Sequence, residues 1–193
     1  MLLPLSKRLY AARAFEEVID TILDDTIALL GAEYGNVQLP IGDALAIVAQ
    51  RGLSARFLMA FRRVNKNDDC ACGRALRLRR TVVVRDVEKD ADFAAFLKDA
   101  REAGFRGVQS TPFFTSDGLL LGMVSTHFAN AHEPTAIELE TLQSYSIVAS
   151  EHAYRLLGNE MLGTKAGRMN TTLYASILRP VSIEARPRAE PTP

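Results

Sequence analysis

Residues 105–128, FRGVQSTPFFTSDGLLLGMVSTHF, decide the fold of this chain. Two runs of apolar, β-branched and aromatic residues, at positions 107–114 and 119–128, flank the polar residues 115–118 (TSDG). Such runs on either side of a short polar segment that ends in glycine are typical of a β-hairpin. We therefore expect two antiparallel strands here, joined by a tight turn.

The hairpin predicts a face for a ligand site. If Phe114 faces Leu119 across the turn, then Ser110 faces Met123, and alternate side chains along each strand point to the same side. A β-bulge at Gly118 would shift this register. One face combines apolar surface with a few polar groups, as ligand sites do. Together with Asp86, which follows the preceding strand, its side chains are the predicted ligand-binding residues: Arg106, Val108, Ser110, Met123, Ser125, His127 and Asp86.

Two of these residues have a structural alternative. His127 could contact a ligand and respond to pH, or it could be a hydrogen-bonded histidine of the sheet. Asp86 could bind a ligand amine, or its carboxylate could stabilise a turn. The sequence leaves both alternatives open for each residue.

Long helices are predicted near both ends of the chain. At residues 6–30, apolar residues recur at the i, i+3, i+4, i+7 spacing of one buried stripe, and Gly31 stands where a C-terminal cap belongs. The second long helix is predicted at residues 134–157, with Pro134 in its first turn. Its stripe suits either a dimer interface or packing on the chain's own sheet. The residues of that stripe are Leu139, Leu142, Ser146, Ala149, Ala153 and Leu156.

Shorter elements lie between the long helices. Runs of β-branched residues bounded by Pro, Gly or Asp predict strands, and helical spacing after an N-cap residue predicts short helices. The strands are residues 35–39, 44–50 and 81–84; short helices begin at Ser54 and Asp69, and another lies within residues 88–105. The order predicts an α+β domain with a five- to six-stranded, mainly antiparallel sheet. The long helices would cover one face, and the short helices would lie over a ligand pocket on the other.

Composition limits the function classes. The chain has 193 residues, 48% of them apolar, which suits one domain with extensions. Lys plus Arg and Asp plus Glu number 23 each, so no net charge favours nucleic acid. No run approaches the roughly 18 apolar residues of a membrane helix, and the N-terminal order of charges is not that of a signal peptide. We expect a cytoplasmic protein that binds neither nucleic acid nor a membrane.

The chain divides into a domain and a C-terminal segment. We expect the domain at residues 1–157 and an extension at residues 158–179. Residues 180–193 are rich in Pro and charged residues, which favours a disordered tail.

Several short motifs follow one another along the chain. They are CGRAL (72–76), VVVRDV (82–87), a helix with Asp92 and Phe93, FRGVQSTPF (105–113), DGLLLGMVSTHF (117–128) and a helix after Pro134. In this order and spacing they resemble a GAF domain over about residues 10–157. The chain is similar to the GAF domains that precede histidine-kinase modules in bacterial two-component sensors, here without a kinase module.

The resemblance implies a fold and a role. The fold would be that of GAF domains, whose architecture is like that of PAS domains and profilin. The role would be small-molecule sensing or regulation in bacterial signal transduction, with an unidentified ligand between the sheet and the short helices. The resemblance also implies a homodimer through the terminal helices, which acts on a separate histidine kinase or another signalling protein. It names no cofactor, and we expect no enzymatic activity.

Two cysteines keep other function classes open. Cys70 and Cys72 lie near the start of a predicted helix, where a thiol becomes more reactive, or they are small buried spacers. Some GAF proteins are thiol-dependent reductases of free methionine sulfoxide, so a redox enzyme is one alternative. A structural dimerisation module without a ligand is another. No metal site is predicted, because His132 and His152 have no Cys or carboxylate at a zinc-binding spacing.

Overall fold

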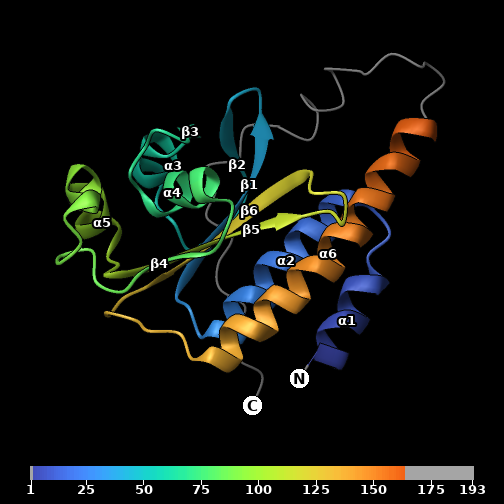
Figure 1. The fold of residues 1–193 in the computed structure, drawn as a ribbon, viewed down its shortest axis with the longest axis horizontal. Coiled ribbons are helices and arrows are strands. Elements are labelled where there is room, and N and C mark those ends of the chain that lie inside the picture. Colours follow the sequence, from blue (N-terminus) through green and yellow to red (C-terminus); the bar gives the residue numbers. More distant parts are fainter. Residues whose placement is uncertain (1, 164–193) are drawn as a thin grey trace.

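An antiparallel sheet of six strands forms the centre of the described part of the chain (Figure 1). The computed structural model describes residues 2–163, with the side chains of residues 5–158. The strands are β1 Tyr34–Ile41, β2 Ala44–Arg51, β3 Val64–Asn65, β4 Val82–Val84, β5 Gly107–Phe114 and β6 Leu120–Phe128. In space their order is β3-β2-β1-β6-β5-β4. This order places β1 and β6 at the centre of the sheet. Every neighbouring pair of strands is antiparallel.

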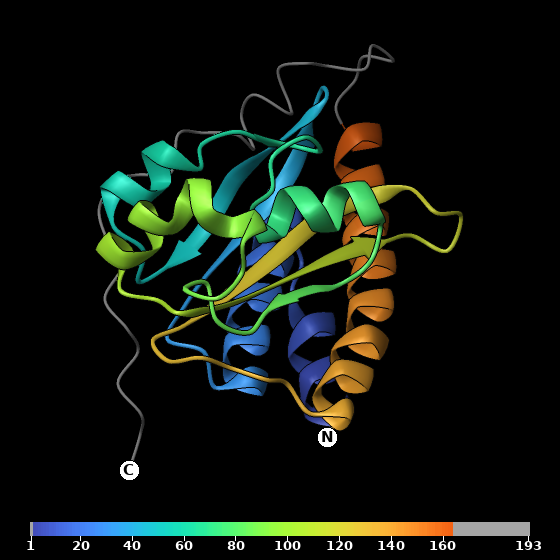
Figure 2. The same cartoon turned by 60° about the vertical axis from the view of Figure 1, so that its left-hand side comes forward.

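The helices lie in two layers, one on each face of the sheet. They are α1 Leu2–Ala11, α2 Phe15–Leu30, α3 Ala55–Ala60, α4 Ala71–Leu78, the 3₁₀ helix η1 Asp92–Phe96, α5 Leu97–Ala103 and α6 Ala136–Gly163. Figures 1 and 2 show α1, α2 and α6 on one face, with α3, α4 and α5 on the other. The predicted α+β fold class is therefore confirmed. The short helices form a lid over one face, and the longer helices form a backing layer on the other.

The predicted N-terminal helix is two helices instead of one. Helix α1 ends at Ala11, and Ala14 has an extended backbone (φ −119°, ψ 154°) before α2 begins. The carboxylate of Glu17 accepts the N–H groups of Arg13 (2.7 Å) and Ala14 (3.3 Å), which lowers the pKa of Glu17. The prediction was wrong here because neither Gly nor Pro marks the break, and a glutamate can cap a helix from its third position.

The hairpin pairs in a different register from the predicted one. Ser110 faces Ser125 and Val108 faces His127, with a bulge between Phe113 and Phe114. Leu119 belongs to the turn: it donates its N–H to Thr115 Oγ1 (3.1 Å), and its carbonyl accepts the N–H of Thr115 (3.0 Å). The predicted register was therefore wrong by two residues. A shift of two keeps every side chain on its face, because side chains alternate with a period of two.

Each face of the sheet has its own apolar core. The backing layer packs on one face around residues such as Phe15, Leu23 and Phe113, and the lid packs on the other around Phe57 and Phe93. Part of the predicted α6 stripe lies in the backing core. Leu142, Ala149 and Ala153 are buried there within a single chain.

The last helix continues past its predicted end at residue 157, to Gly163. The expected tail at residues 180–193 lies outside the described residues.

A buried carboxylate joins the three helices of the backing layer. Asp25 on α2 is fully buried and accepts a hydrogen bond from the Tyr145 hydroxyl on α6 at 2.7 Å. Arg8 on α1 lies 2.8 Å from its other oxygen. Burial raises the pKa of Asp25 in spite of these partners. A buried carboxylate depends on its donors, because each one offsets part of the cost of removing the charge from water.

We expect Tyr145→Phe to lower the free energy of unfolding by about 1.5–3 kcal/mol, since Asp25 would lose its buried donor and keep only Arg8. Urea unfolding followed by circular dichroism measures this change. Tyr154→Phe is the control, because Tyr154 lies on the same helix and is 45% exposed. Equal stability of the two variants would contradict this role for Tyr145.

Candidate functional site

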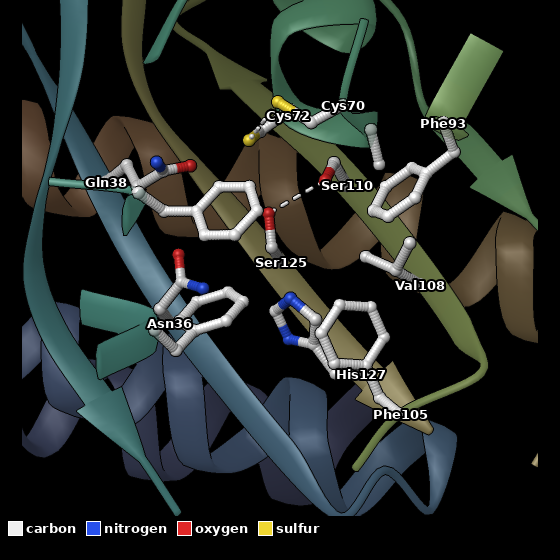
Figure 3. A pocket seen from close by; sticks show the side chains of 13 residues that line it. Asn36, Gln38, Cys70, Cys72, Phe93, Phe105, Val108, Ser110, Ser125 and His127 are labelled. Atoms are coloured by element: carbon white, nitrogen blue, oxygen red, sulfur yellow. Dashed lines mark hydrogen bonds between the residues drawn. The ribbon is translucent and has the colours of Figure 1, made fainter. Parts of the chain in front are cut away.

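A cavity lies between the sheet and the lid (Figure 3). Its floor comes from β1, β5 and β6, and its roof from α3, α4, η1 and the segment before β5. The empty space between the walls, including space open to solvent, is about 300 Å³, but only about 20 Å³ is wide enough for the centre of a water molecule. The lining residues are Asn36, Gln38, Phe57, Phe61, Cys70, Ala71, Cys72, Phe93, Phe105, Val108, Ser110, Ser125 and His127. In this conformation the cavity has room for about one water.

The floor is polar because strand alternation brings polar residues of three strands to one face. Asn36 and Gln38 are two residues apart on β1, and Asn36 pairs with Ser125 on β6. Ser110 and Ser125 face each other and share a hydrogen bond of 2.8 Å between their hydroxyls, drawn as the dashed line in Figure 3. All four side chains are at least 97% buried.

Three buried polar atoms of the floor have no hydrogen-bond partner among the described residues. They are Asn36 Oδ1, Gln38 Oε1 and His127 Nδ1. The great majority of buried polar side-chain atoms in proteins are paired, so each exception needs an explanation. A cluster of such atoms around one cavity indicates a place where a polar molecule can supply the missing partners.

His127 is held as a neutral imidazole. Its ring meets those of Phe57 and Phe105 edge to face, with centroids 5.2 and 4.7 Å away, and the side chain is 3% exposed. Burial lowers the pKa of His127 to about 3. At neutral pH the ring therefore carries one proton and no charge, so that it offers one donor and one acceptor.

The roof of the cavity is aromatic. Phe57 and Phe61 stack with centroids 4.4 Å apart, and Phe93 meets Phe105 edge to face at 6.4 Å. The Ser54 hydroxyl caps α3 by accepting the N–H of Phe57 (3.2 Å), as the sequence predicts, and this directs the helix over the sheet. The cavity therefore has rings on one side and amides, hydroxyls and an imidazole on the other.

The two cysteines lie where the roof meets the floor. Cys70 is the N-cap residue of α4, a position that the sequence predicts for Asp69, and its sulfur lies 3.5 Å from that of Cys72. With Cys72 as the donor, this contact lowers the pKa of Cys70 and, together with burial, raises that of Cys72. Gly73 follows without a side chain, because a Cβ at this position would clash with the carbonyls of Asn65 and Asp68. Cys70 and Cys72 are thus close enough for thiol chemistry, inside the cavity.

The structure brings most, but not all, of the predicted site residues together. Val108, Ser110, Ser125 and His127 line the cavity, and so do Cys70 and Cys72. Met123 is fully buried in the lid-side core and is not a lining residue.

Arg106 and Asp86 lie outside the cavity lining. The Arg106 guanidinium donates to the Asp86 carboxylate (Nε to Oδ1 3.3 Å), and this contact lowers the pKa of Asp86. The Arg106 side chain is 48% exposed. Ligand contact by these two residues stays a prediction.

The sequence prediction missed the contributions of β1 and the roof. Asn36 and Gln38 lie far from the hairpin in sequence and join its face only because β1 pairs with β6. The signal that could have identified them is the alternation of polar residues along β1, a strand that lies beside the hairpin. The phenylalanines at 57, 61, 93 and 105, which line the roof, were not among the predicted site residues.

Among the side chains that the structure describes, those of residues 5–158, the cavity lining contains no Asp, Glu, Lys or Arg. Between residues 2 and 163, no group of three or more His, Cys, Asp or Glu side chains is placed to hold a metal ion. The same part of the chain contains no helix with the length and hydropathy needed to span a membrane.

Comparison with known proteins identifies the fold. A domain of a two-component sensor histidine kinase protein from Sinorhizobium meliloti 1021 is similar with a TM-score of 0.62 and 17% identity, over 79% of this chain and 99% of that one. A free methionine-R-sulfoxide reductase from Neisseria meningitidis matches with a TM-score of 0.63 and 17% identity, over 80% and 87%. A bacteriophytochrome from R. palustris matches with 0.65 and 15%, over 84% of this chain but 38% of its own.

At these identities the solved structures establish a shared fold alone. No curated protein matches the sequence. The family model described as a GAF domain matches residues 12–149, which is well over half of the chain. The chain therefore belongs to the GAF domain family.

Proposed function

We propose that this GAF domain is a non-catalytic sensor of bacterial cytoplasmic signal transduction, which binds a small molecule in the cavity and passes its occupancy to a partner protein. The observation that carries the proposal is the cluster of unpartnered polar atoms on the cavity floor, from Asn36, Gln38 and His127. Leaving a buried polar group unpaired costs about 1–3 kcal/mol. A ligand that pairs these atoms recovers that cost, whereas a purely structural module would gain stability from apolar residues at the same positions.

Binding requires the lid to move. The free space holds about one water, so a larger molecule must separate the roof from the floor. The roof helices are short, with six residues in α3 and eight in α4, and such small elements open at lower cost than the central strands. Opening and closing of the lid is thus the proposed response to the ligand.

The proposed output runs through the backing layer. A homodimer through the terminal helices would transmit occupancy to a histidine kinase or another signalling protein of a two-component system. Exposed apolar side chains are available there: Tyr10 on α1, and Ile147 and Tyr154 on α6, are 55%, 54% and 45% exposed. Sedimentation velocity of the full chain tests the dimer, and a monomer at all micromolar concentrations would contradict it.

Gln38→Leu separates the functional role of the floor from a structural one. We expect this variant to gain about 1 kcal/mol of unfolding free energy without ligand, because it removes a buried amide that has an unpartnered oxygen. Wild-type protein should show a raised thermal midpoint with at least one member of a small-metabolite library, since a ligand that binds only the native state stabilises it. Gln38→Leu should show a clearly smaller response, because it binds the ligand more weakly.

The matched control is Gln109→Leu. Gln109 on β5 is 1% exposed and also has an unpartnered Oε1, but strand alternation places it on the backing face, away from the cavity. Its replacement should leave the ligand response unchanged. A library that stabilises none of the three proteins, or stabilises all three equally, would contradict a ligand site on this floor.

A second function is favoured by one observation, the 3.5 Å contact of the Cys70 and Cys72 sulfurs inside the cavity. In a thiol-dependent sulfoxide reductase, two thiols would reduce one sulfoxide, giving a thioether, a Cys70–Cys72 disulfide and water. Formation of methionine from added methionine sulfoxide, with loss of two free thiols in the wild-type chain and no methionine formed by a Cys70→Ser, Cys72→Ser variant, would establish this activity. Thiol titration without any such loss would remove it.

A further inference from the structure

We infer that the ligand of this cavity is an uncharged, flat, nitrogen-containing ring compound that carries hydrogen-bond donors and acceptors on its edge, of the nucleobase or pyridine-carboxamide kind. The inference rests on the proposed function, because it specifies the chemistry of the molecule bound at that site. Three properties of the lining support it: the absence of charged side chains, the aromatic roof, and the two neighbouring amide side chains of the floor.

The lining excludes ions. The described residues of the lining include no Asp, Glu, Lys or Arg, and His127 is neutral at physiological pH. An ion that leaves water for such a site, without an opposite charge, would lose several kcal/mol of solvation. Phosphates, carboxylates and ammonium groups are therefore disfavoured, and with them free amino acids, which counts against methionine sulfoxide as the occupant of this cavity.

Charged groups near the cavity already have partners. Arg74 on α4 donates to both oxygens of Asp90 (3.0 and 2.9 Å), and Arg106 is bound to Asp86. None of these groups is left to balance the charge of a ligand.

The roof selects a flat molecule. Phe57, Phe61, Phe93 and Phe105 all line the cavity, and ring faces and edges in this cluster contact one another with centroids 4.4–6.4 Å apart. Aromatic rings at these distances prefer offset-stacked or edge-to-face neighbours. A planar ring can enter between them and the sheet with a smaller displacement of the lid than a bulky aliphatic compound would need.

The floor selects a ring with donors and acceptors. Asn36 and Gln38 each carry one carbonyl and one amino group, so each can both accept and donate. Residues two apart on a strand are separated by roughly 7 Å, and the ring of His127 lies on the same floor. The edge of a heterocycle carries N–H donors next to carbonyl or ring-nitrogen acceptors. Such an edge can form two hydrogen bonds with one amide side chain.

Matched ligand pairs test the inference, since their members share a ring and differ in charge. Nicotinamide with nicotinate, and adenosine with adenosine monophosphate, would be titrated against the full chain by thermal unfolding and calorimetry. We expect stabilisation by an uncharged member of at least one pair, and no response to its charged counterpart. Gln38→Leu and Asn36→Leu should each weaken binding about tenfold, the equivalent of about one hydrogen bond, while Gln109→Leu retains it.

The outcomes separate this inference from the proposed function. Binding of nicotinate or adenosine monophosphate as tight as that of its uncharged counterpart would overturn the inference and leave a small-molecule site in place. The same holds if neither pair binds but protein purified without denaturation carries a charged small molecule. No binding by either pair and no co-purified molecule would overturn both.

Discussion

The difference in unfolding free energy between wild-type protein and His127→Gln should shrink by about 1.4 kcal/mol for each pH unit below about 6. Burial lowers the pKa of His127 to about 3 in the native state, whereas the unfolded chain titrates near 6.5. Between these values the unfolded state binds a proton that the native state does not. Acid therefore favours unfolding, and stability that is present above pH 6.5 is lost as the pH falls toward 3.

Urea unfolding of both proteins between pH 7 and pH 4 measures this effect. Carboxylates such as Asp86, which lose their native interactions in the same range, contribute equally to both proteins and cancel in the difference. The lost ring contacts with Phe57 and Phe105 add a constant offset, so the pH slope is the readout. Parallel curves would show that His127 is not buried as a neutral ring on the cavity floor.

Gly73→Ala should lower the free energy of unfolding by about 1–3 kcal/mol. A Cβ at this position would clash with the Asp68 carbonyl and lie 2.8 Å from the Asn65 carbonyl. Those carbonyls cannot easily retreat, because Asn65 and Asp68 hold each other: the Asn65 N–H bonds the Asp68 carboxylate at 2.7 Å and the Asp68 N–H bonds the Asn65 carbonyl at 3.1 Å. The start of α4, with both cysteines, would have to leave its place in the roof.

Gly158→Ala is the matched control for this substitution. Gly158 lies within α6, and a Cβ there would meet no atom within 4 Å. Alanine in a helix interior is more favourable than glycine by about 0.5–1 kcal/mol, so this variant should be slightly more stable than wild type. Urea unfolding that shows the same small change for both glycines would contradict the close packing of α4 on residues 65–68.

Much of the fold was predictable because its signals are local. The hairpin at residues 107–128, the strand pair from Tyr34 to Arg51 and the helix after Pro134 each follow from periodicity and turn residues. The predicted face of the hairpin supplies four cavity-lining residues even though the register was wrong, because Leu119 joined the turn and the resulting shift was two residues. The break between α1 and α2 was missed because it depends on one side chain, Glu17, that reaches back to cap the second helix.

The candidate site was only half predictable for a different reason. Ser110, Ser125 and His127 come from adjacent strands, so one hairpin brings them together. Asn36 and Gln38 reach the same floor only through the pairing of β1 with β6, which links segments about half the domain apart in sequence. The mutual pairing of Arg106 and Asp86 likewise depends on tertiary geometry, because strand periodicity gives a side chain's face but not its partner.

Native mass spectrometry of protein purified without denaturation tests the central claim, a small molecule on the floor formed by Asn36, Gln38 and His127. We expect the wild-type chain to carry a non-covalent adduct of low mass that dissociates on denaturation. The adduct should persist in Gln109→Leu and be clearly reduced in Gln38→Leu. A wild-type spectrum that shows only the bare polypeptide, or an adduct that Gln38→Leu retains in full, would contradict it.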